Sequence, residues 1–113
     1  MLLILGAGQV FGQHNIKIQI TGMQDSTGII GYHYGSQRLV LDTAVIDAEG
    51  QLVISGNEQL ATGVYFLYTP SFYLEFIVKE QVFAIKTSQT AAYKEMTVVG
   101  SKENELFRDF QVK

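Results

Sequence analysis

The chain of 113 residues contains no cysteine and only one proline. Without cysteine it can form no disulfide, thiolate metal site or thiol nucleophile, and it cannot perform dithiol redox chemistry. Basic residues are also few: eight lysines and arginines against eleven acidic residues give a net charge of −3. Nucleic-acid binding requires a basic surface that neutralises phosphates. The composition therefore argues against a nucleic-acid partner and against cysteine-based enzymes.

Charge is scarce in general, since charged residues make up 17% of the chain and apolar residues 47%. A disordered chain would show the opposite balance, with many charges and few apolar groups. A length of 113 residues is typical of one domain and is sufficient for one hydrophobic core. We therefore predict a single folded domain.

The amino terminus has the features of an export signal. A short apolar run at residues 2–5 leads to small residues, and Val10-Phe11-Gly12 before Gln13 fits the small-residue rule for signal cleavage. No lysine or arginine precedes the run, so we interpret residues 1–12 as a signal peptide truncated at its start. The protein would then be exported to the periplasm or cell envelope. The alternative is that residues 2–5 form the first strand of the fold.

From residue 15 onward, apolar and polar side chains alternate. Ile16, Ile18 and Ile20 share one face, which is typical of a half-buried strand. Similar runs predict further strands at 29–34, 39–47, 51–55, 64–68, 73–79, 82–86 and 96–99. We expect 39–55 to form one hairpin around a turn at 47–50. Because the connections are too short for parallel crossovers, the prediction is an all-β, antiparallel sandwich of seven to eight strands.

The last thirteen residues predict a short helix from about residue 101. Ser101 is a suitable N-cap, and two glutamates follow in the first turn, where the helix dipole favours them. We expect Leu106 and Phe110 to pack on the sandwich and Phe107 to remain partly exposed, so these three residues are the candidate interface. The helix lacks a glycine stop signal, which indicates that residues 13–113 are the amino-terminal part of a longer protein.

The residues that could perform chemistry show no catalytic or metal-binding spacing. His14 and His33 are far apart, whereas a metal site needs three or four ligands. The carboxylates are scattered, and the chain has neither a G-x-S-x-G motif nor a phosphate-binding glycine motif. We expect His14 to be exposed, His33 to be an ordinary strand residue, and Asp42 to face solvent or bond to Thr43. We therefore predict no catalytic residue, no metal and no cofactor, and a protein that is not an enzyme. No segment is long enough for a transmembrane span.

Aromatic residues gather in the middle of the chain, at Tyr65, Phe66, Tyr68, Phe72 and Tyr73. We expect alternate members to pack in the core, but together they are also compatible with a sugar-stacking patch. A ligand- or glycan-binding module outside the cytoplasm is therefore the alternative function. Several tyrosines on one exposed face would favour binding. An exposed apolar strip on the helix would favour a scaffold.

Several short motifs occur together in a familiar order. They are D-T-A at 42–44, D-x-x-G at 47–50, G-x-Y at 63–65 and G-S-x-E-N at 100–104. In this order, the region 14–113 resembles the β-rich domain of unknown function that precedes the thioredoxin-like domain in bacterial envelope thiol-disulfide oxidoreductases of the thiol:disulfide interchange type. The 39–55 segment and the G-x-Y strand are also similar to prealbumin-like sandwiches fused to outer-membrane proteins.

The resemblance implies a context for the chain. In such proteins the redox work belongs to a C-x-x-C motif in the following domain, and this chain has no cysteine. No catalytic residue is therefore carried over. The implied role is a non-catalytic accessory domain that docks, spaces or dimerises a thioredoxin-like domain outside the cytoplasm. The implied partners are that domain and a second copy of this chain.

Overall fold

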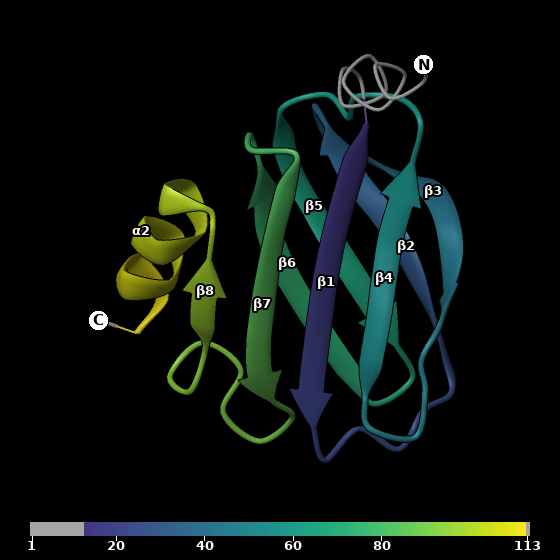
Figure 1. Cartoon of the computed structure of the whole chain (residues 1–113), viewed down its shortest axis with the longest axis vertical. Coiled ribbons are helices and arrows are strands. Elements are labelled where there is room, and N and C mark those ends of the chain that lie inside the picture. The colour runs from purple at the N-terminus through teal and green to yellow at the C-terminus, as the bar shows by residue number, and fades with distance from the viewer. Residues whose placement is uncertain (1–12, 113) are drawn as a thin grey trace, which may run out of the picture.

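The computed structural model describes residues 13–112, which form a two-layered β-sandwich with one helix at its side (Figure 1). Sheet A has the strand order β4-β1-β7-β8, and sheet B has the order β3-β2-β5-β6. The strands of sheet A are β4 (Gln51–Gly56), β1 (His14–Thr21), β7 (Val82–Ser88) and β8 (Thr97–Val99). The strands of sheet B are β3 (Gln37–Val45), β2 (Thr27–Tyr34), β5 (Gly63–Thr69) and β6 (Phe72–Val78). Helix α2 (Lys102–Gln111) stands beside β8 and contacts β6 and β8.

The predicted fold class is confirmed: two four-stranded, mostly antiparallel sheets pack as a sandwich, with a C-terminal helix. The side-chain alternation of β1 has the expected effect, since Ile16, Ile18 and Ile20 are all buried. The segment proposed as a signal peptide, residues 1–12, lies outside the described residues. Within them, no helix is long and apolar enough to cross a membrane.

The core lies between the two sheets and takes its side chains from both. Sheet A contributes the isoleucines of β1 with Leu52 and Ile85, and sheet B contributes Leu67, Leu74 and Phe76. Tyr65 lies among them, with its ring stacked between those of Tyr32 and Phe76. Burying each large side chain stabilises the fold by about 1.5–3 kcal/mol. Because the inward residues of each strand are apolar, this shared core holds the two layers together.

The expectation of a purely antiparallel sandwich is wrong at one pair of strands. Strands β1 and β7 lie parallel, in register from the pair Asn15 and Val82 to the pair Thr21 and Ser88. A short connection excludes parallel pairing only between strands that follow one another in the chain. Five strands separate β1 from β7 in sequence, so the folding of the sandwich, and not a local turn, brings them together.

The predicted hairpin over 39–55 is also wrong, although its turn is correct. Asp47 Oδ1 accepts hydrogen bonds from the backbone N–H groups of Glu49 and Gln51, both at 2.9 Å. Gly50 has a φ of +80°, and a Cβ there would overlap the carbonyl oxygen of Ile20. However, β3 pairs with β2 in sheet B, while β4 pairs with β1 in sheet A. The turn therefore connects the two layers, because each strand finds its ladder partner elsewhere.

The helix begins as expected but turns a different face to the sandwich. Ser101 caps it, since its Oγ accepts a hydrogen bond from the backbone N–H of Asn104 at 3.2 Å. Leu106 is 54% exposed and Phe110 72% exposed, so the expectation that these two residues pack on the sheets is wrong. Phe107 is the packed aromatic residue, with its ring edge-on to Tyr93 at 6.0 Å. Its packing places it on the inner side of the helix, where it stays partly exposed, as expected.

Candidate functional site

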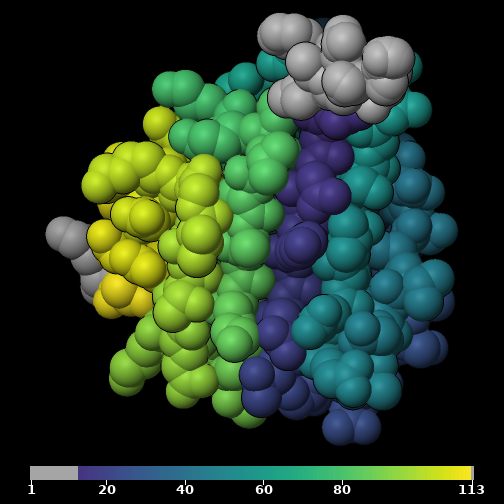
Figure 2. All heavy atoms as spheres, in the orientation of Figure 1, coloured from purple at the N-terminus to yellow at the C-terminus, as the bar shows by residue number. Residues whose placement is uncertain are grey.

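Three surfaces of the sandwich carry side chains that the core does not explain. They are the outer face of sheet A, the outer face of sheet B and the outward side of α2. Figure 2 shows the outer face of sheet A, which no helix of residues 13–112 covers, since α2 stands at its edge.

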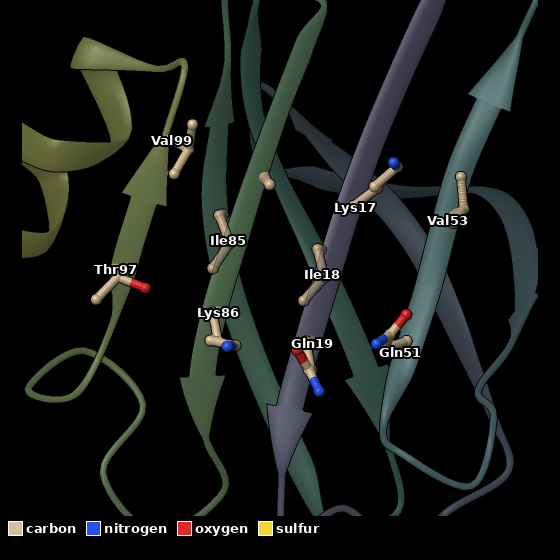
Figure 3. A pocket seen from close by; sticks show the side chains of 10 residues that line it. Lys17, Ile18, Gln19, Gln51, Val53, Ile85, Lys86, Thr97 and Val99 are labelled. Carbon is tan, nitrogen blue, oxygen red and sulfur yellow. The ribbon is translucent and has the colours of Figure 1, made fainter.

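A shallow groove of about 390 Å³ lies on the outer face of sheet A (Figure 3). Ala84 on β7 is its small central residue, flanked by Lys17 on β1 and Val99 on β8. Val53 on β4 lies opposite Lys17 on the other side. The short side chain of Ala84 leaves space between longer neighbours, so the sheet is hollowed there. A second hollow of about 470 Å³ shares Lys17, Ala84 and Val99 and extends the groove toward Gly100.

The groove combines two lysines with aliphatic and amide side chains. Lys86 lies opposite Gln19 and Thr97, so it is a diagonal neighbour of Lys17 on the same face. Such diagonal neighbours are about 7–8 Å apart at their Cα atoms. The residues that line the groove include no aspartate or glutamate. These side chains suit the binding of an extended peptide segment or of an anionic group. The residues that line the groove include no nucleophile paired with a base.

The outer face of sheet B carries an aromatic cluster built around Phe66. Phe66 is only 6% exposed although it points away from the core between the sheets. Its ring lies 5.4 Å from the ring of His33 and 5.8 Å from that of Tyr73, the latter nearly parallel at 24°. Gly31 makes room for it, since a Cβ at Gly31 would overlap the Phe66 ring and the carbonyl oxygen of Leu39. Sheet B therefore has a small second core on its outer face.

Polar groups border this aromatic cluster. Glu75 Oε2 accepts hydrogen bonds from His33 Nε2 at 2.9 Å and from the Tyr73 hydroxyl at 3.2 Å. Partial burial raises the pKa of the Tyr73 hydroxyl, and the neighbouring Glu75 carboxylate raises it further. Arg38 lies opposite His33 in the β2–β3 ladder and so belongs to the same face. Acceptors and donors thus border the apolar centre at Phe66.

The outward side of α2 forms what we call the helix ridge, Leu106 and Phe110. The two residues are one turn apart and fall on one side of the helix. The opposite side is anchored by Asn104, which is 1% exposed. Asn104 Oδ1 accepts a hydrogen bond from the Ile77 N–H, and Asn104 Nδ2 donates one to the Ile77 carbonyl, both at 2.7 Å. The ridge is therefore presented by a helix that is held firmly in place.

Asn104 has a second role at the edge of sheet B. Strand β6 is an edge strand, whose outward N–H and C=O groups would otherwise be free to pair with another chain. The Asn104 amide bonds both backbone groups of Ile77, and the Tyr93 hydroxyl bonds both of Glu75, at 3.0 and 3.3 Å. Side chains thus take the place of a fifth strand. Sequence reasoning assigned a role to Ser101 but missed Asn104, because the sequence does not show which side of the helix packs on the sheet.

The structure places the other sequence-predicted residues as follows. His33 is a strand residue, as expected, but it also pairs with Glu75 on the face described above. The expected bond between Asp42 and Thr43 is confirmed, since Asp42 Oδ1 accepts a hydrogen bond from the Thr43 N–H at 2.8 Å. His14 is half-buried and its Nδ1 bonds the Glu58 carbonyl, so the expectation of an exposed residue is wrong.

The alternation expected of the aromatic segment is confirmed. Tyr65 and Phe72 belong to the core between the sheets, while Phe66, Tyr68 and Tyr73 point outward. Within residues 13–112, no three histidine, aspartate or glutamate side chains converge as a metal site. The structure therefore brings aromatic and polar side chains together on sheet B, and it separates them from the helix residues that were predicted as an interface.

Comparison with known proteins supports the coarser part of the resemblance, which is a domain of unknown function over most of the chain. No curated protein and no solved structure gives a significant match to the chain. Residues 14–107 match the family described as a domain of unknown function, DUF4369. The match spans β1 to the middle of α2 and thus includes the whole sandwich and the Asn104 anchor. The chain belongs to this DUF4369 family.

Proposed function

We propose that the chain is a non-catalytic interaction domain that docks or dimerises a thioredoxin-like domain of the same protein outside the cytoplasm. The observation that carries the proposal is the helix ridge, an apolar surface on a firmly anchored helix. We propose that Leu106 and Phe110 form the contact. The role of Phe107 is then to hold the helix on the sandwich, so it contributes to the interface only indirectly.

The energetics of the ridge support a partner. Removing a leucine or phenylalanine side chain from water contributes about 1.5–3 kcal/mol, so two such exposed side chains are a reserve of binding free energy. They lie next to each other on one side of the helix, which is the arrangement that helix-in-groove contacts use. Because the Asn104 side chain holds the helix against β6, presenting the ridge needs no ordering step. A preordered contact loses less entropy on binding.

The identity of the partner rests on the resemblance of the motifs at 42–44, 47–50, 63–65 and 100–104. The chain itself supplies no thiol, so any dithiol chemistry of the intact protein would reside in another domain. An accessory domain would position that domain relative to its substrates or to a second copy. A surface of apolar residues on the helix suits such a permanent contact better than a transient one.

The first test is to read the sequence of the gene that encodes the protein. The reading frame that continues past codon 113 is expected to encode a thioredoxin-like domain with a C-x-x-C motif. A frame without such a domain would contradict the proposed partner. The second test uses that domain as the probe, added to the isotope-labelled chain and followed by NMR. We expect the amide signals of Leu106 and Phe110 to shift on titration.

The matched variants separate the ridge from the rest of the surface. Replacing Leu106 and Phe110 together by aspartate should abolish the shifts without unfolding the sandwich. Val45, an exposed valine on the edge strand β3, provides the control, and Val45→Asp should leave the titration unchanged. If the double variant still binds the thioredoxin-like domain with unchanged affinity, the ridge is not the contact.

A further inference from the structure

We propose that the outer face of sheet B binds a neutral carbohydrate, with a sugar ring stacked on Tyr68 and Tyr73 and its hydroxyl groups bonded by Glu75 and Arg38. This surface is distinct from the helix ridge, and the proposal does not depend on the docking function. It gives the cluster around Phe66 a binding role in addition to its packing on the outer face of sheet B.

The platform consists of two tyrosines on neighbouring strands. Tyr68 on β5 and Tyr73 on β6 lie directly opposite each other in the ladder. Residues in this position have Cβ atoms about 4.5–5.5 Å apart and share one face of the sheet. Tyr68 is 47% exposed and Tyr73 39% exposed, so each ring is reachable from solvent. The electron-rich faces of aromatic rings suit the C–H groups of a pyranose, which is apolar on its ring face.

Tyr73, one half of the platform, is also held in place, which an accidental cluster would not require. The Tyr73 ring lies nearly parallel to Phe66, and Phe66 is seated over Gly31. The Tyr73 hydroxyl donates to Glu75, so both ends of this side chain are positioned. Aromatic side chains bring a large contact area at a small entropic cost when their rings are fixed before binding.

The polar border supplies both kinds of hydrogen-bonding group. A carboxylate has about four acceptor sites, and both described contacts of Glu75 use Oε2. Oε1 is therefore available for ligand hydroxyl groups. Arg38 adds donors from β3, on the same face as His33. One carboxylate, one guanidinium and one imidazole do not sum to a strong charge of either sign, so the surface suits a neutral sugar better than an anion or a cation.

A proline-rich peptide is the other ligand that stacks on aromatic side chains. Peptides of this kind dock in grooves between aromatic rings. Tyr68 and Tyr73 lie directly opposite each other on one face of the sheet, so their rings form a shared platform for a single ring. The sheet B platform has an acceptor, Glu75, and a donor, Arg38, at its border. These features favour a sugar ring over a polyproline helix.

The experiment is affinity electrophoresis of the whole chain in native gels that contain soluble mixed-linkage β-glucan, arabinoxylan or galactomannan. We expect at least one of these polysaccharides to retard the protein relative to a gel without polysaccharide. Tyr68→Ala and Tyr73→Ala should each weaken the association about tenfold or more, because stacking area is lost. Tyr34, exposed at the end of β2 and outside the platform, is the control, and Tyr34→Ala should migrate like the unmodified chain.

Several outcomes would overturn the proposal. These are equal migration with and without all three polysaccharides, an equal loss of retardation in Tyr34→Ala, or binding of a proline-rich peptide in place of the sugars. Thermal melting of each variant confirms that it is folded. Tyr68→Ala changes an exposed side chain and should melt within a few degrees of the unmodified chain, so it keeps the test valid if Tyr73→Ala is unstable. The Leu106 and Phe110 double variant should bind polysaccharide normally, which separates this site from the docking surface.

Discussion

The most direct test of how the helix is attached is to replace Asn104 with alanine. The Asn104 side chain makes three hydrogen bonds within the fold. Two of them join the Ile77 backbone at 2.7 Å, and the third joins Ser101 Oγ at 2.9 Å. Alanine removes all three, and it leaves the N–H and the C=O of Ile77 unpaired at the edge of sheet B.

The expected loss follows from the groups left without partners. A buried polar group that loses its hydrogen bond costs about 1–3 kcal/mol. The two groups of Ile77 are only partly buried, so their combined cost is roughly 2–4 kcal/mol. A domain of this size has a total stability of about 5–15 kcal/mol, and each kcal/mol shifts Tm by about 4–8 °C. We therefore expect Tm to fall by roughly 10–30 °C.

Urea denaturation followed by circular dichroism measures this loss in free energy. Asn57→Ala, in the exposed connection after β4, is the matched control and should stay within about 0.5 kcal/mol of the unmodified chain. Asn104→Asp should be at least as unstable as the alanine variant, because its carboxylate faces the Ile77 carbonyl oxygen and offers no donor. Hydrogen exchange at the Ile77 amide should accelerate in both Asn104 variants.

The reasoning would be refuted by a small effect. If Asn104→Ala loses less than about 0.5 kcal/mol and the Ile77 amide stays protected, another contact holds the helix to the edge of β6. If Asn104→Asp is as stable as the unmodified chain, the donor to the Ile77 carbonyl contributes nothing. Either result would also weaken the argument that the helix ridge is presented in a fixed position.

Three further predictions concern other parts of the molecule. Gly31→Ala should destabilise the fold by about 1–3 kcal/mol in urea denaturation, because the new Cβ meets backbone and a packed ring. Gly63→Ala is the control and should be nearly neutral, because the space around Gly63 is open. Equal losses in the two variants would contradict this prediction. Phe107→Ala should destabilise the fold by somewhat less than the ~3–5 kcal/mol typical of a fully buried phenylalanine, because the Phe107 ring is partly exposed. A loss below about 0.5 kcal/mol would show that Phe107 does not anchor the helix. Hydrogen bonds from Ser71 lower the pKa of Asp25 below its usual 3.8, so its ionised form stabilises the fold above that pH and the contribution is lost as the pH falls through the lowered pKa. The stability difference between the unmodified chain and Asp25→Asn should therefore shrink between pH 6 and pH 2, and a constant difference would contradict it.

Much of the fold was predictable because strand alternation is a local property. The isoleucines of β1 and the alternating residues of β6 show in sequence which side chains face the core. The turn at 47–50 was predictable for the same reason, since Asp47 and Gly50 satisfy it within five residues. What a local pattern does not contain is the partner of each strand. For that reason the turn was correct and the hairpin was wrong.

The surfaces were less predictable than the core. The outward aromatic residues Phe66, Tyr68 and Tyr73 follow from alternation along two strands, but their grouping with His33 requires the β2–β5 and β5–β6 pairings. Residues 33 and 75 are 42 positions apart, and no spacing rule links them. The groove over Ala84 likewise forms only because β1, β4 and β8 join β7 in sheet A.

The helix shows most clearly where sequence determination ends. Sequence alone determined that a helix begins after Ser101 and that its three large apolar residues cover more than one side, because capping and helical spacing are local. Only the tertiary structure decided which side is buried. The edge of β6 offers two unpaired backbone groups at Ile77, and the one side chain of the helix that satisfies both at once is Asn104. Pairing these groups turns Phe107 inward and leaves Leu106 and Phe110 to solvent, because Asn104 and Phe107 lie on one side of the helix and Leu106 and Phe110 on the other.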